Sequence, residues 1–265
     1  MKRLFKTLLI VLFLLSALPV HADVLTIAPC DEVIVNLFGD QICLSKDEGV
    51  LRRYVNGKML NIFSGQDLMG NLILQDPLRP ILDGANNIYM LDAATNTVIG
   101  WDRFLNIHSV TPLHEDILSP KDFTITSEHD WLIYDDFYDQ ILQIHPGENF
   151  YTDWGDKPVN DEIRLFSLEN QVVVYLENDS LIRICDENGT TLSEHSLPLG
   201  LKITKIFPLE NLSFALKTDT GIFIWKPENN LLRYLIDLEK VIHVSQSQDN
   251  HYLLISQDGE VLTIP

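Results

Sequence analysis

The sequence has 265 residues, of which 38 are acidic and 19 are basic, and its formal net charge at pH 7 is -19. This excess of acidic residues disfavours binding to nucleic acid or to an anionic membrane surface, because both require clustered Lys and Arg side chains. The chain has three cysteines, too few for a scaffold held together mainly by disulfides.

The N-terminal segment has the pattern of a secretory signal peptide of the bacterial type. Basic residues precede an apolar run at 8–15, and Val20 and Ala22 are small residues at the positions that a signal peptidase reads. A membrane anchor is the alternative, but the run is shorter than the roughly 20 residues that span a bilayer. We therefore predict a signal peptide at 1–22 and one domain at 23–265. The mature protein is expected in the periplasm or outside the cell and is not expected to span a membrane.

The mature chain is long enough for one large domain with a sizeable core, since cleavage would leave about 243 residues and a net charge of about -22. Cys30 and Cys43 could pair in an oxidising compartment and close a loop of roughly a dozen residues. Cys185 would then be left unpaired in a predicted buried strand. Three separate core thiols are the alternative, because a free cysteine packs as a small hydrophobe.

Six short strands recur at a nearly constant spacing. Each begins with two apolar residues, and successive starts lie 48, 43, 40, 41 and 39 residues apart. A period near 40 is typical of propeller blades, in which each repeat forms one four-stranded antiparallel sheet. The six strands are expected at 50–54, 98–102, 141–145, 181–185, 222–226 and 261–265.

Further strands are predicted around each of these six. A preceding strand is expected at 41–44, 88–91, 131–134, 172–176, 213–216 and 252–255. A still earlier strand is expected at 33–37, 80–83, 122–126, 163–167, 203–208 and 241–245. An outer strand closes the first five units at 59–63, 107–110, 150–154, 191–196 and 232–236. Asp or Asn follows each of the preceding strands, those that begin with 41–44. A role in the hairpin turns explains these residues.

The sixth unit stops after its third strand, so it needs a fourth strand from elsewhere. The segment Val24–Ile27 precedes the first unit and has no other role in the pattern. Pairing it with 261–264 would close the ring and leave no sheet edge open. We therefore predict an all-β, six-bladed β-propeller that is closed by its mature N-terminal strand. The long first spacing comes from an extra segment, Ser64–Leu74, expected to be a loop or one helical turn.

The second unit resembles an NHL-type repeat. Pro80 opens its inner strand, Asn86 and Asn87 turn it, 88–92 is an apolar strand that ends in Asp, and 96–102 contains an Asn-rich turn and the third strand. Fragments of the same pattern occur in the third unit. The resemblance implies a six-bladed propeller. Propellers of this type include protein-binding and glycan-binding modules as well as metal-dependent hydrolases and lyases, so the fold alone does not choose a function.

The densest polar and aromatic cluster lies in a predicted turn of the third unit. It places three carboxylates within five residues, which could bind a hard cation such as calcium. The spacing is not that of an EF-hand, however, and a solvated hairpin turn is the plainer explanation. Exposed aromatic rings beside carboxylates would suit a protein or sugar partner. The predicted binding face is Tyr134, Asp135, Asp136, Phe137, Tyr138 and Asp139.

A calcium site in the central channel is implied by the resemblance to calcium-dependent propeller hydrolases, which hold their ion with acidic or amide residues of the inner strands. The metal candidates on this basis are Asp83, Asp122 and Glu162, with Glu32 and Asn211 as further members. The seven histidines of the mature chain form no close ligand pair. The sequence contains no Gly-x-Ser-x-Gly elbow and no Gly-rich phosphate loop. We therefore predict no catalytic or cofactor-binding residue.

These patterns favour an exported binding scaffold without enzymatic activity, whose partner is a protein or peptide held on one rim. The alternatives are a calcium-dependent, lactonase-like hydrolase with a metal in the channel, and a glycan-binding or cell-envelope structural module. Functional residues are expected where the units differ from one another. This points to the Ser64–Leu74 insertion and to the Tyr134–Asp139 turn.

Overall fold

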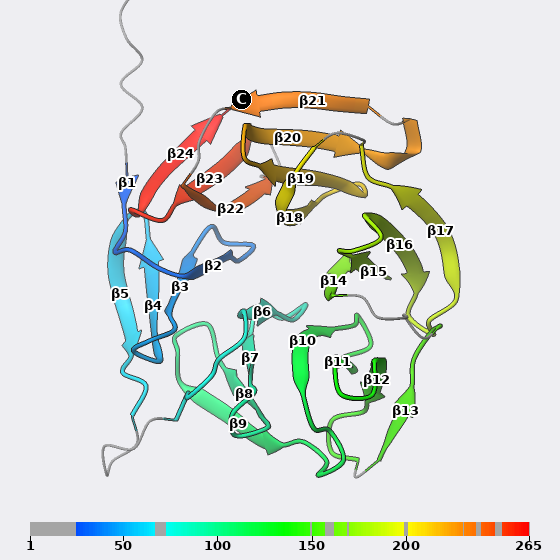
Figure 1. Ribbon diagram of the computed structural model, residues 1–265. Helices are drawn as coiled ribbons and strands as arrows, with labels where there is room; N and C mark the ends of the chain where they lie inside the picture. Colours follow the sequence, from blue (N-terminus) through cyan, green and yellow to red (C-terminus); the bar gives the residue numbers. More distant parts are fainter. Residues whose placement is uncertain are drawn as a thin grey trace, which may run out of the picture.

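The computed structural model describes residues 25–66, 73–148, 150–156, 162–168, 170–198, 201–229, 231–236, 240–246 and 251–264. Within these residues the chain forms six four-stranded antiparallel sheets arranged in a ring around a central axis (Figure 1). The predicted fold, an all-β six-bladed propeller, is confirmed.

Each sheet forms one blade, whose strands run in order from the innermost, at the central axis, to the outermost. Blade 1 contains β2 (Glu32–Val35), β3 (Gln41–Ser45), β4 (Val50–Val55) and β5 (Lys58–Phe63). Blade 2 contains β6 (Ile81–Leu82), β7 (Ile88–Asp92), β8 (Thr97–Trp101) and β9 (Ile107–Pro112). Blade 3 contains β10 (Pro120–Ile125), β11 (Trp131–Asp135), β12 (Gln140–Ile144) and β13 (Tyr151–Asp153).

The other three blades follow the same order. Blade 4 contains β14 (Ile163–Leu168), β15 (Gln171–Leu176), β16 (Leu181–Asp186) and β17 (Thr191–Ser196). Blade 5 contains β18 (Ile203–Leu209), β19 (Ser213–Thr218), β20 (Gly221–Lys226) and β21 (Leu231–Ile236). Blade 6 contains β22 (Val241–Gln246), β23 (Tyr252–Ser256), β24 (Glu260–Ile264) and β1 (Leu25–Thr26).

Four antiparallel strands return the chain to the rim from which it started, so every innermost strand begins at the same side of the ring. We call this side the start rim and the opposite side the end rim. The innermost strand of blade 2 is shorter than the sequence predicts. Pro80 has no N–H group to donate, and the side chain of Asp83 accepts hydrogen bonds from the N–H groups of Ala85 and Asn87, which begins the turn.

Six apolar clusters fill the wedges between neighbouring blades, and each cluster takes side chains from both blades. The second strand of a blade packs against both neighbours, so β7 and β15 are almost entirely buried. This is why their sequences are near-continuous apolar runs. The outermost strands β5 and β17 instead face solvent and carry exposed residues. The core is therefore a ring of wedges around the central axis.

The two ends of the described chain meet in blade 6. Leu25 pairs with Val261 and Thr26 with Glu260, which makes β1 the outermost strand of that blade (Figure 1). Beyond β1, the N–H of Ile27 donates to the carbonyl of Gly259 over 2.8 Å. The predicted closure of the ring by the N-terminal strand is thus confirmed.

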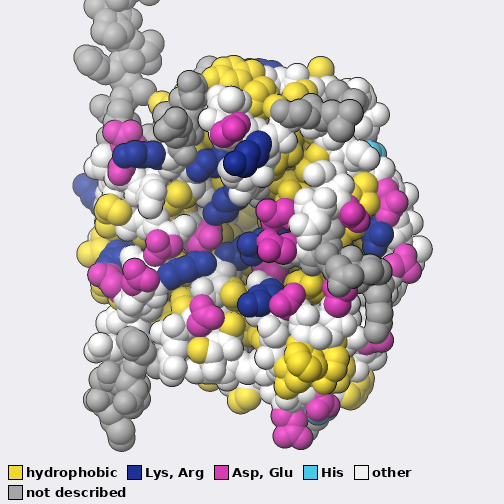
Figure 2. Space-filling view, in the orientation of Figure 1, with side chains coloured by type: hydrophobic (Ala, Val, Ile, Leu, Met, Phe, Trp, Pro, Cys, Tyr) yellow, Lys and Arg dark blue, Asp and Glu magenta, His cyan; other side chains and the backbone are white. Residues whose placement is uncertain are grey.

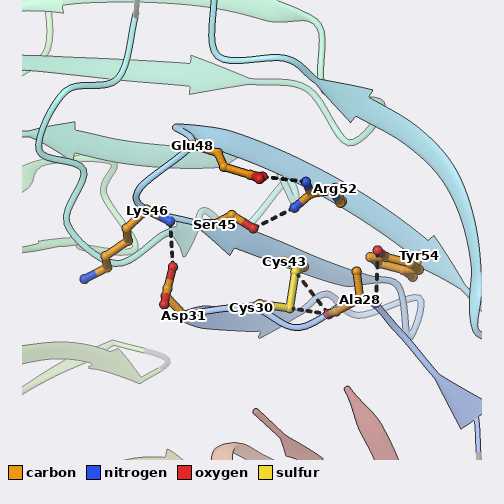
Figure 3. Close-up of a disulfide and its surroundings, with 9 residues drawn as sticks. All are labelled: Ala28, Cys30, Asp31, Cys43, Ser45, Lys46, Glu48, Arg52 and Tyr54. Carbon is orange, nitrogen blue, oxygen red and sulfur yellow. Dashed lines mark hydrogen bonds and ion pairs between the residues drawn. A yellow bond between two sulfur atoms is a disulfide. The ribbon is translucent and has the colours of Figure 1, made fainter. Parts of the chain in front are cut away.

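A disulfide between Cys30 and Cys43 fastens the segment that leaves β1 to strand β3 (Figure 3). Beside it, the N–H of Ala28 donates a hydrogen bond to the hydroxyl oxygen of Tyr54 over 3.2 Å. Of the two predicted alternatives, a disulfide or three separate thiols, the structure has the disulfide. Cys185 is a buried free thiol in β16.

Three segments predicted from the sequence lie wholly or partly outside the residues that the structure describes. The signal peptide at 1–22 lies outside the described residues, as does Val24 of the closing segment and most of the Ser64–Leu74 insertion, 67–72. The one helix among the described residues is a three-residue turn, η1 (Pro227–Asn229). None of the described helical structure is long and apolar enough to cross a membrane.

Gly259 makes the ring closure possible, and we expect Gly259→Ala to weaken it. Gly259 has a φ of +83°, and an added Cβ would overlap the Ile27 carbonyl oxygen. Gly147 is a matched control, since its φ is +93° and nothing lies within 4 Å of its added Cβ. Gly147→Ala should cost about 1 kcal/mol of unfolding free energy in backbone strain. Gly259→Ala should cost about 2 kcal/mol more, because the backbone at Ile27 must move.

Urea unfolding of the two variants measures this difference directly. Equal losses of unfolding free energy in Gly259→Ala and Gly147→Ala would contradict the role assigned to the contact with Ile27.

Candidate functional site

All six innermost strands contribute to a central channel. They line a cavity of about 320 Å³ with mostly apolar side chains, among them Ile34, Leu82, Phe166 and Ile242. The polar lining includes His243 from β22. The channel is thus a narrow apolar space with a few polar groups, which is the usual composition of a small-ligand site.

The start-rim end of this channel is densely charged. We call it the channel mouth, an opening of about 330 Å³ that shares several lining residues with the channel. Figure 2 shows Lys and Arg side chains gathered around the central hollow with Asp and Glu side chains between them. The charged lining of the channel mouth is Glu32, Lys46, Arg79, Lys121, Asp122, Glu162, Arg164, Glu177 and Lys205.

Asp122 is a buried carboxylate whose oxygens are fully engaged. Its Oδ1 accepts a hydrogen bond from Nε of Arg79 over 3.0 Å, and its Oδ2 accepts from the N–H of Leu165 over 2.6 Å. Arg79 also donates to the carbonyl of Phe123 and stacks over the ring of Phe166 at 4.9 Å. This network joins blades 2, 3 and 4, so it stabilises the geometry of the channel mouth.

Glu32 and Lys205 join blades 1 and 5 across the channel mouth. Their charged atoms lie 2.7 Å apart, and Lys46 lies 3.9 Å from the same carboxylate. On the neighbouring strand, opposite Lys205, Nζ of Lys217 donates to the carbonyl of Val241 over 2.7 Å. Burial and the positive charge of Lys205 lower the pKa of Lys217. The cluster therefore carries more positive charge than its carboxylates neutralise.

His243 lies deeper in the channel, with its ring 6.1 Å from that of Phe207. The residue is partly buried and lines the channel, and its Nε2 atom is buried. Burial, with a contribution from Lys205, lowers the pKa of His243 to about 3. The imidazole is therefore neutral at physiological pH, and its Nε2 has no hydrogen-bond partner among the described residues.

The three metal candidates from the sequence do not come together. Asp122 and Glu162 both line the channel mouth. Asp83 follows the end of β6 on the end rim, where it accepts hydrogen bonds from Ala85 and Asn87 and borders a different pocket. In the part of the chain that the structure describes, no group of three or more His, Cys, Asp or Glu side chains could hold a metal ion. Calcium binding at these carboxylates stays a prediction.

The turn predicted as a binding face connects β11 and β12 on the start rim. Asp135 is completely buried, and its carboxylate accepts hydrogen bonds from the N–H groups of Leu118 over 2.7 Å and Phe137 over 2.9 Å. Asp92 makes the corresponding bonds in blade 2. Asp135 is therefore a structural residue of the blade that ties the incoming loop to the turn.

The rest of this turn divides into buried and exposed side chains. Tyr134 is buried, and its hydroxyl donates to Asp139 over 3.2 Å. Burial and the carboxylates of Asp139 and Asp136 raise the pKa of Tyr134. Phe137 and Tyr138 are exposed and pack edge to face, with ring centroids 4.8 Å apart. A binding role for the turn stays a prediction, and these two rings are the residues available for it.

Sequence reasoning missed an exposed cluster on the end rim. We define the end-rim patch as Leu37, Phe38, Arg103 and Phe104. Leu37, Phe38 and Phe104 are 79%, 61% and 49% exposed. The guanidinium of Arg103 lies 4.5 Å from the ring centre of Phe38 and 5.0 Å from that of Phe104. The available sequence signal was the adjacent apolar pair Leu37 and Phe38 at the end of the predicted strand 33–37, a strand that ends at Val35 in the structure.

The backbone of the end-rim patch is held by short hydrogen bonds. The N–H of Leu37 donates to the side chain of Asn86 in blade 2 over 3.0 Å, and the N–H of Phe104 donates to Asp102 over 2.8 Å. Arg103 has no ion pair or hydrogen bond from its side chain to any described residue, and its Nε is buried. The patch is thus a preformed aromatic surface with one uncompensated cation.

Comparison with known proteins identifies the fold and leaves the family open. No family model and no curated protein matches the sequence. A streptogramin B lyase structure has a TM-score of 0.63 and 10% identity, covering 91% of this chain and 96% of its own. A gluconolactonase from Xanthomonas campestris has a TM-score of 0.63 and 9% identity, and the match covers 91% of this chain and 88% of the gluconolactonase.

A virginiamycin B lyase from Staphylococcus aureus is also similar, with a TM-score of 0.59 and 8% identity. The match covers 90% of this chain and 84% of the lyase. At these identities the likeness extends to the six-bladed fold alone. The resemblance to NHL-type repeats has no support from sequence comparison.

We expect Asp135→Ala to destabilise the fold and Asp136→Ala to have little effect. Asp135→Ala leaves the buried N–H groups of Leu118 and Phe137 without an acceptor, which should cost about 2 to 4 kcal/mol. Asp136 belongs to the same turn but is exposed, so its replacement should change the free energy of unfolding by about 0.5 kcal/mol or less. Urea unfolding distinguishes the two, and equal effects would show that Asp135 is not the structural acceptor.

Proposed function

We propose that this protein is an exported binding scaffold that holds a protein or peptide partner on its end rim. The observation that carries this proposal is the position of the Arg103 guanidinium between the exposed rings of Phe38 and Phe104. Aromatic and Arg side chains dominate the energetics of protein interfaces, especially when they are held rigidly before binding.

The chemistry of the end-rim patch describes its partner. Leu37 and Phe38 offer apolar area, which favours an apolar side chain on the partner. Arg103 lacks a counterion among the described residues, so a carboxylate beside that apolar side chain would complete the contact with a bidentate hydrogen bond. The partner we propose is a protein segment that carries an acidic residue next to an apolar one.

Export is part of the same proposal. The N-terminal pattern at 1–22 supports secretion. The disulfide between Cys30 and Cys43 also fits an oxidising compartment such as the periplasm.

A hydrolase or lyase is the second candidate, favoured by the fold that the chain shares with a gluconolactonase and with streptogramin-inactivating lyases. Asp122 is less available to the channel calcium of this candidate, because its carboxylate is already held by Arg79 and Leu165. A glycan-binding module is the third candidate. The exposed pair of Phe137 and Tyr138 supports it, because aromatic rings suit a sugar partner. Retention on a polysaccharide column that is lost in a Phe137→Ala, Tyr138→Ala variant would favour it.

Site-specific photo-crosslinking in the native host tests the end-rim patch. A photoreactive phenylalanine analogue at position 38 or 104 should capture the same partner. Arg103→Ala should lower the yield at position 38 at least about tenfold, as loss of an interfacial hot spot does. The same analogue at position 137 on the start rim is the control. Adducts formed at 137 and absent at 38 and 104 would move the partner to the face predicted from the sequence.

Thermal unfolding with calcium or with a chelator tests the metal-dependent alternative. We expect the Tm to be the same in both, because a ligand raises the Tm only if the folded state binds it. A rise in Tm with calcium that is lost in Glu162→Gln and retained in Asp83→Asn would instead establish a metal site at the channel mouth and favour the hydrolase.

A further inference from the structure

We propose that the central channel binds a small organic acid, with its carboxylate at the channel mouth beside Lys205 and its apolar body inside the channel against Phe166. This site lies on the opposite rim from the end-rim patch and does not depend on the proposed function.

The charge at the channel mouth differs from that of the whole chain. The complete sequence has twice as many acidic as basic residues, 38 against 19. The channel mouth is lined by five basic and four acidic side chains. Basic residues are therefore concentrated at this opening of a strongly acidic protein. In a cleft with low-dielectric walls, such an excess attracts and holds an anion.

The inner cations are only partly neutralised. Glu32 is the one carboxylate that pairs with Lys205 among the described residues, and it is shared with Lys46. Lys217 is beside Lys205 on the neighbouring strand and has a carbonyl oxygen as its partner. Burial, and after it the charge of Lys205, disfavour protonation of both Lys217 and His243. An added anion at this point would offset that unfavourable potential.

Two further cations surround the same opening from blades 3 and 4. Lys121 in β10 and Arg164 in β14 are exposed, and neither forms an ion pair with any residue that the structure describes. By contrast, the guanidinium of Arg79 is already committed to Asp122 and to the backbone. The groups that an anion would contact are therefore Lys121 and Arg164, together with Lys205, which shares Glu32 with Lys46.

The channel below the mouth suits an apolar body. Phe166 and Ile242 are only partly buried although most of their surroundings are apolar, so a ligand would remove apolar surface from water. At the mouth, Nζ of Lys205 lies 5.5 Å from the ring centre of Phe207, so the charged group is next to the apolar lining. A cavity of about 320 Å³ accommodates at least about ten non-hydrogen atoms, at roughly 30 Å³ each.

Calorimetric titration at low ionic strength with matched probes tests this site. The probes are 3-phenylpropionate, the uncharged 3-phenylpropan-1-ol with a similar body, and acetate with the same anionic group. The acid should bind with a Kd on the order of 1 mM or tighter. The alcohol and acetate should each bind at least about tenfold more weakly, because each lacks one of the two contacts.

Two lysine variants distinguish binding at the channel mouth from a general effect of the protein's charge. Lys205→Met should weaken binding of the acid at least about tenfold while leaving the alcohol unchanged, which also shows that the channel is intact. Lys240→Met removes the same charge from an exposed residue that pairs with Asp258 and does not line the channel or its mouth, and it should leave binding of the acid unchanged. Arg103→Ala should also leave it unchanged, which keeps this result separate from that of the end-rim patch.

Titration with the peptide N-acetyl-Gly-Gly-Phe shows whether the carboxylate belongs to a free acid or to the C-terminus of a polypeptide. Tighter binding of the peptide than of the acid would mean that the ligand is the C-terminus of a chain, and weaker binding would mean a free acid. The proposal is overturned if the acid does not bind, if the acid and the alcohol bind equally, or if Lys205→Met and Lys240→Met have the same effect.

Discussion

The antiparallel pairing of β1 with β24 is the constraint on which the ring depends. Each blade packs its faces against two neighbours, so blades 1 and 6 can bury both of their faces only if the circle is complete. The pair itself is short, with Leu25 opposite Val261. The apolar cluster between blades 6 and 1 and the disulfide from Cys30 to Cys43 hold the same region together. The closure thus combines backbone pairing, apolar burial and a covalent bond at one place.

Buried carboxylates provide a second set of links between the blades. Asp92 and Asp135 each accept backbone N–H groups from the loop that enters the blade and from the turn that follows. Asp122 accepts from Arg79 and Leu165 and so connects three blades. Part of the acidic content of the chain is therefore structural. It leaves fewer carboxylates for metal binding than the composition suggests.

The two rims present different chemistry to a partner. The end rim has exposed apolar rings around an uncompensated Arg103. The start rim has a charged opening above an apolar channel, and basic side chains are concentrated there. The innermost strand β2 connects the two rims, because it lines the channel and is followed by the turn that carries Leu37 and Phe38. A molecule bound in the channel would contact this strand.

The sequence predicted the repeat period, the number of strands in each unit and the missing last strand. These features depend on the local spacing of apolar runs and on turn residues. The same local information identified the turn of Phe137 and Tyr138 but could not separate buried Asp135 from exposed Asp136. It also left the pairing of Cys30 with Cys43 open. Only the tertiary structure decided which residues share a rim. Arg103 reaches Phe38 from another blade, and Asp122 meets Arg79 and Leu165, because the curvature of the ring brings distant units together.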